Sequence, residues 1–131
     1  MTSTETVQAS EAPQPTLFSE LPLGPELQRA IQDQGYAHCT PIQAKAIPVV
    51  LSGRDVMGAA QTGTGKTAAF VLPMLTILEK GRARARMPRT LILEPTRELA
   101  AQVEESLTKY GKNHKLSIAL LIGGEIGRAH V

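Results

Sequence analysis

The stretch that decides the fold is Ala60-Gln61-Thr62-Gly63-Thr64-Gly65-Lys66-Thr67. It follows a short hydrophobic run, residues 55–59, which predicts a buried strand. It precedes residues 66–72, which predict the start of a helix. A loop of small residues between a strand and a helix leaves backbone N–H groups available to an anion, and the helix dipole adds positive charge there. The stretch therefore predicts a phosphate-binding loop.

Individual residues of this loop have the chemistry that a nucleoside triphosphate requires. Gly63 and Gly65 allow backbone conformations and close approaches that a Cβ prevents. Lys66 is expected to reach the β- and γ-phosphates, and the Thr67 hydroxyl to coordinate Mg²⁺. Ala60 stands where the general pattern G-x-x-x-x-G-K-[ST] has glycine, and alanine is the smallest replacement. The alternative, a chance glycine-rich turn, does not explain why strand, loop, Gly-Lys-Thr and helix occur in the required order.

Composition indicates the class of protein. A chain of 131 residues with 42% hydrophobic residues corresponds to one domain or less. No apolar run reaches the length of a membrane span, and the N-terminus lacks the hydrophobic centre of a signal peptide. Cys39 is the only cysteine, which excludes a disulfide framework and a thiolate zinc site. We expect a soluble, cytoplasmic protein.

Charge is unevenly distributed along the chain. Residues 1–40 carry one Arg and five acidic residues, whereas residues 41–131 carry thirteen Lys and Arg and seven acidic residues. A basic C-terminal part is compatible with a polyanionic partner. Four of those basic residues come from the segment 82–89 alone, which is also typical of a solvated connector. With only four aromatic residues, contacts to nucleic acid are expected to go mainly to phosphates.

The N-terminal third predicts a tail followed by two helix starts. Residues 1–16 are polar and rich in Pro, Ser and Thr, and predict a disordered tail. Pro25 after Gly24 predicts a helix that ends before Gly35. Residues 40–43, Thr-Pro-Ile-Gln, predict a second helix with a capping box. The alternative role of Gln43 is to bind the Hoogsteen edge of adenine through its amide, which has donors and an acceptor. Spacing alone favours the cap.

The C-terminal part continues the alternation of strands and helices. The helix from Lys66 is expected to run to about residue 80, with Pro73 kinking or dividing it. Residues 90–93 predict a second buried strand and residues 116–122 a third. Strand, helix, strand, helix and strand in this order indicate an α/β fold with a parallel sheet.

A helix is predicted to begin at Arg97, with Thr96 as its cap. A cation in the first turn opposes the helix dipole. An ion pair with Glu94 or Glu98 would explain Arg97, and so would an external phosphate held together with the first N–H groups of the helix.

Several of these segments together resemble the DEAD-box ATP-dependent RNA helicases. Residues 35–43 are similar to the Q motif, residues 60–67 to motif I, residues 95–100 to motif Ia, and Gly123-Gly124 to the GG doublet. The resemblance covers residues 17–124. It implies an incomplete RecA-like (P-loop) domain that binds ATP with Mg²⁺ and the backbone of single-stranded RNA.

The resemblance also implies roles for single residues. Phe18 would stack on or cover the adenine, and Gln43 would recognise it, which reverses the preference for a purely capping role. Thr62, Gly63, Thr64, Gly65, Lys66 and Thr67 would bind phosphates, with Thr67 on the metal. Thr96, Arg97, Gly123 and Gly124 would lie along the RNA.

Other family segments are missing from the sequence. There is no Asp-Glu-Ala-Asp segment, no Ser-Ala-Thr segment and no second RecA-like domain. We therefore expect this chain to be a fragment of a helicase that unwinds RNA duplexes. The fragment itself is expected not to hydrolyse ATP at a useful rate and to be prone to aggregation. Residues 125–131 resemble the translation of a sequencing adapter and are expected to be a non-native tail. The alternatives are another P-loop enzyme, such as a small kinase or GTPase, and a non-catalytic RNA-binding or regulatory module.

Overall fold

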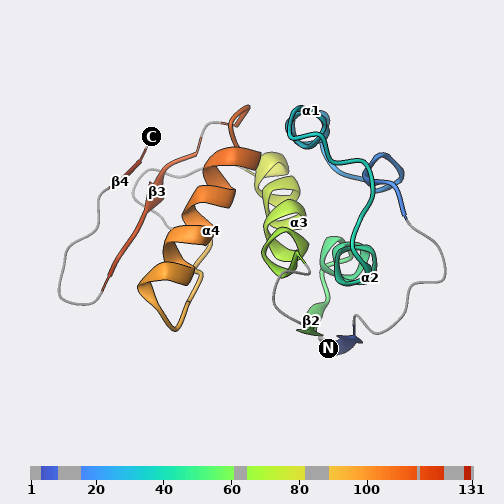
Figure 1. Cartoon of the computed structure of the whole chain (residues 1–131), viewed down its shortest axis with the longest axis horizontal. Helices are drawn as coiled ribbons and strands as arrows, with labels where there is room; N and C mark the ends of the chain where they lie inside the picture. Colours follow the sequence, from blue (N-terminus) through green and yellow to red (C-terminus); the bar gives the residue numbers. More distant parts are fainter. Residues whose placement is uncertain are drawn as a thin grey trace.

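The computed structural model describes residues 4–8, 16–60, 65–81, 89–114, 116–122 and 129–130. The chain is built of helices and short strands (Figure 1). The elements are β1 (Thr4–Gln8), the 3₁₀ helix η1 (Phe18–Glu20), α1 (Pro25–Asp33), α2 (Pro41–Leu51), β2 (Asp55–Ala59), α3 (Lys66–Lys80), α4 (Arg97–Tyr110), β3 (Ile118–Ala119) and β4 (Ala129–His130).

The predicted helix starts are confirmed. Helix α1 begins with Pro25, and the chain leaves it through Gly35, whose φ of 79° suits glycine. Helix α2 begins with Pro41. At the start of α4 the Thr96 hydroxyl accepts a hydrogen bond from Leu99 N at 3.1 Å. Pro73 lies inside α3 without dividing it, because the helix runs unbroken from Lys66 to Lys80.

Helix α3 forms the centre of the molecule and lies between α4 on one side and α2 on the other (Figure 1). Its side chains are apolar on most faces, so it is buried from several directions. The core that it organises also takes residues from η1, α1, α2 and α4. Its buried members include Phe18, Leu27, Ile31, Ile47, Val71, Leu72, Leu75, Val103 and Leu107.

A second set of contacts joins α1 to the turn that follows α4. Lys112 Nζ forms a salt bridge with Asp33 Oδ2 at 2.6 Å, and Asn113 Nδ2 donates to Glu26 O at 3.2 Å. The turn after α4 therefore contacts both the first and the last turn of α1.

Strand pairing differs from the prediction. Strand β1 pairs parallel with β2, from Thr4 opposite Asp55 to Gln8 opposite Ala59. Strand β3 has two residues and pairs antiparallel with β4. Residues 90–93 form no strand in the described structure, and Leu91 and Leu93 are 81% and 83% exposed. The prediction of a strand at residues 90–93 is therefore wrong. Hydrophobic runs favour extended backbone, but pairing requires a neighbouring strand.

Two further expectations change in detail. Strand β2 has the predicted bounds but is largely exposed. Within the described ranges it pairs only with β1, and one of its faces packs on α2. The expected tail at residues 1–16 includes the strand β1, and residues 1–3 and 9–15 lie outside the described residues. Strand β4 falls within residues 125–131, whose non-native origin stays a prediction. No described helix is long and apolar enough to cross a membrane.

Candidate nucleotide-binding site

The exit of the predicted phosphate loop is a glycine in the left-handed region. Gly65 has φ 82° and ψ 28° and directly precedes the first residue of α3. A Cβ at this position would overlap the Gln43 amide nitrogen and approach Thr40 Oγ1 to 3.3 Å. Both conformation and space therefore require glycine here. Thr62, Gly63 and Thr64 lie outside the described residues.

The Gln43 side chain connects this glycine to the start of α2. Its Oε1 accepts a hydrogen bond from Thr40 N at 3.0 Å, and its Nε2 donates to Gly65 O at 3.1 Å. The side chain is only 6% exposed. A primary amide has two N–H groups and two lone pairs on oxygen, so one of each has no partner among the residues that the structure describes. These are the groups that adenine recognition needs, and capping and base recognition are therefore compatible.

The first turn of α3 combines backbone donors with a lysine and a threonine. Ala69 N is bonded to Gly65 O, so the N–H groups of the three residues before it have no acceptor within the helix. The first turn contains no acidic residue, and no side chain caps Gly65. Lys66 is exposed and Thr67 is half-buried. A glycine cradle, a helix N-terminus, an ammonium and a hydroxyl fit a magnesium triphosphate.

The Phe18 segment pairs with the chain that leads into α2. Phe18 N donates to Ala37 O at 2.9 Å, and Cys39 N donates to Thr16 O at 2.7 Å. The Phe18 ring is 5% exposed and belongs to the hydrophobic core. Burial raises the pKa of the Cys39 thiol to about 11, so the thiol stays protonated at neutral pH. This pairing fixes the backbone just before the capping threonine.

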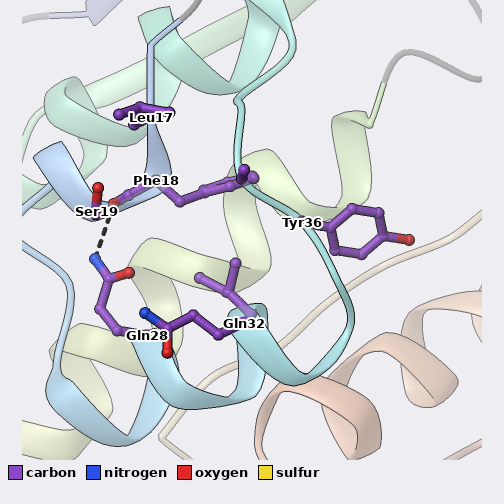
Figure 2. Close-up of a pocket in the computed structure, with 8 residues that line it drawn as sticks. Leu17, Phe18, Ser19, Gln28, Gln32 and Tyr36 are labelled. Atoms are coloured by element: carbon purple, nitrogen blue, oxygen red, sulfur yellow. Dashed lines mark hydrogen bonds between the residues drawn. The ribbon is translucent and has the colours of Figure 1, made fainter.

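A cavity of about 150 Å³ lies beside Phe18 (Figure 2). Gln28 lines the cavity and donates a hydrogen bond through Nε2 to Phe18 O at 2.8 Å. Tyr36 also lines the cavity and is 48% exposed. Lys109 Nζ lies 5.6 Å from the centroid of the Tyr36 ring. Gln43 is not among the residues that line it. The described structure therefore does not bring Phe18 and Gln43 into one cavity. The sequence patterns do not predict this cavity; the one signal for it is Tyr36, the aromatic residue after Gly35.

Thr96 and Arg97 lie exposed at the start of α4. Helices α3 and α4 lie side by side and run in the same direction, so they begin at the same end of the molecule (Figure 1). The predicted phosphate-binding and RNA-binding residues of these two helices therefore share one end. Gly123 and Gly124 lie outside the described residues.

A strand that passes through a small-residue loop into a helix beginning Lys-Thr defines the P-loop class of nucleotide-binding proteins. Comparisons with known proteins identify the family within this class. The family model for DEAD/DEAH box helicases matches residues 40–130. The chain belongs to the DEAD/DEAH box helicase family.

Two curated relatives show how much of the family this chain represents. It is 52% identical over 110 residues to the ATP-dependent RNA helicase SrmB of Escherichia coli, covering 83% of this chain and 25% of the relative. It is 47% identical over 111 residues to DEAD-box ATP-dependent RNA helicase 32 of Arabidopsis thaliana, covering 84% of this chain and 15% of the relative. The chain thus spans a quarter or less of the length of these relatives.

Two solved structures have the same fold. The RNA helicase Prp28 from Chaetomium thermophilum, bound to ADP, superposes with a TM-score of 0.77 at 38% identity, over 87% of this chain and 28% of that protein. A DEAD box protein from Methanococcus jannaschii gives 0.75 at 34% identity, over 86% and 30%. These similarities confirm the expected fold class, an incomplete RecA-like α/β domain.

Proposed function

We propose that this chain is the nucleotide-binding part of an ATP-dependent RNA helicase and binds ATP with Mg²⁺ at the start of α3. The observation that carries the proposal is the Gln43 amide, which lies against Gly65 with a donor and an acceptor left for adenine. Two relatives are named ATP-dependent RNA helicases, and a structural neighbour is bound to ADP.

The residues divide the work of binding the nucleotide. The first N–H groups of α3 and the Lys66 ammonium would hold the phosphates, which would lie close to the Gly65 backbone. Thr67 would hold Mg²⁺, which neutralises charge on the phosphates when bound. Gln43 would select adenine. Phe18, whose ring is packed in the core, would act through the backbone pairing that fixes the segment before Thr40. Thr62, Gly63 and Thr64 complete the loop in this proposal.

RNA would bind at the start of α4 through its backbone. Thr96 and Arg97 are exposed there, at the same end of the molecule as Lys66 (Figure 1). A helix N-terminus with an adjacent guanidinium is suited to phosphate groups. Gly123 and Gly124 are proposed to lie along the same strand.

We do not assign ATP hydrolysis to the chain by itself. Lys66 and Thr67 would position phosphates and metal, and the attacking water would be oriented by carboxylates of the complete helicase. Duplex unwinding coupled to hydrolysis is proposed for the complete helicase.

Equilibrium binding of fluorescent ATP and GTP analogues tests the proposal. The chain is expected to bind the ATP analogue more tightly. Lys66→Ala is expected to weaken binding at least about tenfold, because a charge-assisted contact to phosphate is lost. Lys80→Ala, at the other end of the same helix, is the matched control. Preference for the GTP analogue would indicate another P-loop enzyme. RNA binding that ignores both nucleotide and Lys66→Ala would indicate a non-catalytic RNA-binding module.

A further inference from the structure

Gln28 is a half-buried amide on α1 to which the proposed function gives no role. Its Nε2 donates to Phe18 O at 2.8 Å and to Leu21 O at 3.2 Å. The first of these bonds is the dashed line in Figure 2. An amide has two N–H groups, one for each of these oxygens. One side chain thus holds the carbonyl groups at the start of η1 and directly after it, and fixes this turn to α1.

The packing between η1 and α1 is apolar in its centre. Phe18 and Leu21 are buried in one cluster with Leu27 and Ile31 of α1. Apolar contact holds two surfaces together but is not directional. Hydrogen bonds have a preferred distance and angle, so the two bonds from Gln28 set the register of the η1 backbone on the helix.

The start of η1 is also paired with the segment before α2. Phe18 N donates to Ala37 O at 2.9 Å, and Cys39 N donates to Thr16 O at 2.7 Å. An isolated antiparallel bridge lies between these two bonds. The segments on either side of α1 are therefore held in register with each other, and Gln28 holds one of them.

The paired segment leads directly to the amide that is proposed to bind adenine. Cys39 precedes Thr40, whose N–H donates to Gln43 Oε1 at 3.0 Å. Gln43 Nε2 donates to Gly65 O at 3.1 Å. A shift of residues 37–39 would move Thr40 N, and with it the oxygen end of the amide, while Gly65 holds the nitrogen end. The orientation of the Gln43 amide thus depends on the register of residues 37–39.

We infer that Gln28 is a positioning residue of the nucleotide site: by holding η1 it keeps residues 37–39 in register and so orients the Gln43 amide for adenine. The inference rests on the proposed function. Without the two N–H donors, η1 keeps its apolar contacts but loses its fixed register. If roughly a third to a tenth of the molecules keep the competent register, the apparent Kd for an adenine nucleotide rises about three- to tenfold, because affinity scales with the competent fraction.

The test compares the full chain with variants that keep the length of the side chain. Gln28→Met removes both N–H donors and keeps a high helix propensity. Gln28→Glu keeps the shape and polarity of glutamine but has no hydrogen to donate at neutral pH. Gln32→Met is the matched control, since Gln32 lies one turn later on α1, lines the same cavity and is exposed.

Two measurements are made on each variant. Binding of the fluorescent ATP and GTP analogues reports the site, and hydrogen exchange of the Phe18 and Cys39 amides reports the register. Both Gln28 variants are expected to bind the ATP analogue about three- to tenfold more weakly, with little change for the GTP analogue. The preference for adenine then falls by the same factor, which a general loss of stability would not produce.

Exchange of the Phe18 and Cys39 amides is expected to become at least about tenfold faster in both Gln28 variants. The α4 amides are expected to keep their protection, since the opening is local. Gln32→Met is expected to match the parent in every measurement.

Every other outcome overturns the inference or the function on which it rests. Unchanged exchange in both Gln28 variants overturns the hold on η1. Faster exchange with unchanged nucleotide preference, or an equal effect of Gln32→Met, overturns the positioning role. Loss of α4 protection in both Gln28 variants also overturns it, because Gln28 would then support the fold as a whole. If the parent does not bind the ATP analogue, or Lys66→Ala binds as well as the parent, the proposed function fails, and exchange alone decides whether Gln28 holds the register.

Discussion

The Gln43 side chain joins Thr40 N, at 3.0 Å, to Gly65 O, at 3.1 Å. The two bonded residues lie in different segments, one before α2 and the other before α3. A single buried amide therefore sets the position of one helix start relative to the other.

Replacing Gln43 separates its two roles. Gln43→Ala leaves Thr40 N without its partner and removes one of the two hydrogen bonds to Gly65 O, which also accepts from Ala69 N. This costs about 1–3 kcal/mol of folding free energy, measurable by urea unfolding. If the amide also recognises adenine, the preference for the ATP over the GTP analogue falls about tenfold. Asn113→Ala, which removes another amide bonded to a backbone oxygen and lies in the turn after α4, is the control. A loss of stability with unchanged nucleotide preference would assign Gln43 to capping alone.

Gly65→Ala tests the fit between the loop exit and Gln43. The variant is expected to lose about 1–2 kcal/mol from the left-handed backbone, and more from displacement of the Gln43 amide. Nucleotide affinity is expected to fall as well. Gly53 has a similar φ of 83° and nothing within 4 Å of an added Cβ. Gly53→Ala therefore measures the backbone cost alone, and equal losses in both variants would contradict the contact.

Residues 91–93 test which face of the unpaired segment is inward. Leu91 and Leu93 are exposed, whereas Ile92 packs against the core. Leu91→Lys with Leu93→Lys is expected to reduce aggregation, seen by light scattering, and to change the unfolding free energy by no more than about 0.5 kcal/mol. Ile92→Lys is expected to destabilise by several times that amount. A similar effect of both changes would show that the segment packs differently.

A pair of carboxyl groups predicts a dependence of stability on pH. The hydrogen bond with Glu26 raises the pKa of Glu79 above 4.5, and the same bond lowers the pKa of Glu26. His114 Nε2 lies 3.8 Å from Glu79 Oε2, and Arg29 also acts on Glu26. The Glu79 contribution is fully present below 4.5 and is lost as pH rises through its raised pKa. The Glu26 contribution is present above 4.5 and is lost as pH falls through its lowered pKa.

Glu79→Gln is the informative variant, because glutamine keeps the shape of the protonated acid and does not ionise. Its melting temperature relative to the parent is expected to rise between pH 4.5 and pH 7, as the parent loses the shared proton. Glu105→Gln, an exposed change on α4, is the control and should show no such trend. A difference that stays constant across this pH range would show that the two carboxyl groups do not share a proton in solution.

Local signals in the sequence predicted the helix starts, and distant pairing was not predictable. Pro25, Pro41 and Thr96 act on their own helix within one turn, so their effects follow from residue type and order. Residues 90–93 have the composition of a strand, but a strand forms only where a partner is available. Val7 and its neighbours were assigned to a tail for the same reason, since their partner is about fifty residues away.

The candidate site divides in the same way. Glycine, lysine and threonine at the loop exit follow from the motif, and the amide at Gln43 follows from its residue type. That Gln43 contacts Gly65, 22 residues away, depends on the packing of α2 against α3. The cavity beside Phe18 depends on the turn after α1, and residue composition does not encode it.

The shared direction of α3 and α4 has an electrostatic consequence. Two helix dipoles that point the same way reinforce each other at their common end, where about half a positive charge per helix is concentrated. A phosphate held at one helix start lowers the potential felt at the other. Two polyanions bound side by side would therefore lower each other's binding affinity unless Lys66 and Arg97 offset the added negative charge. These two cations therefore determine how strongly the binding of one ligand opposes the binding of the other.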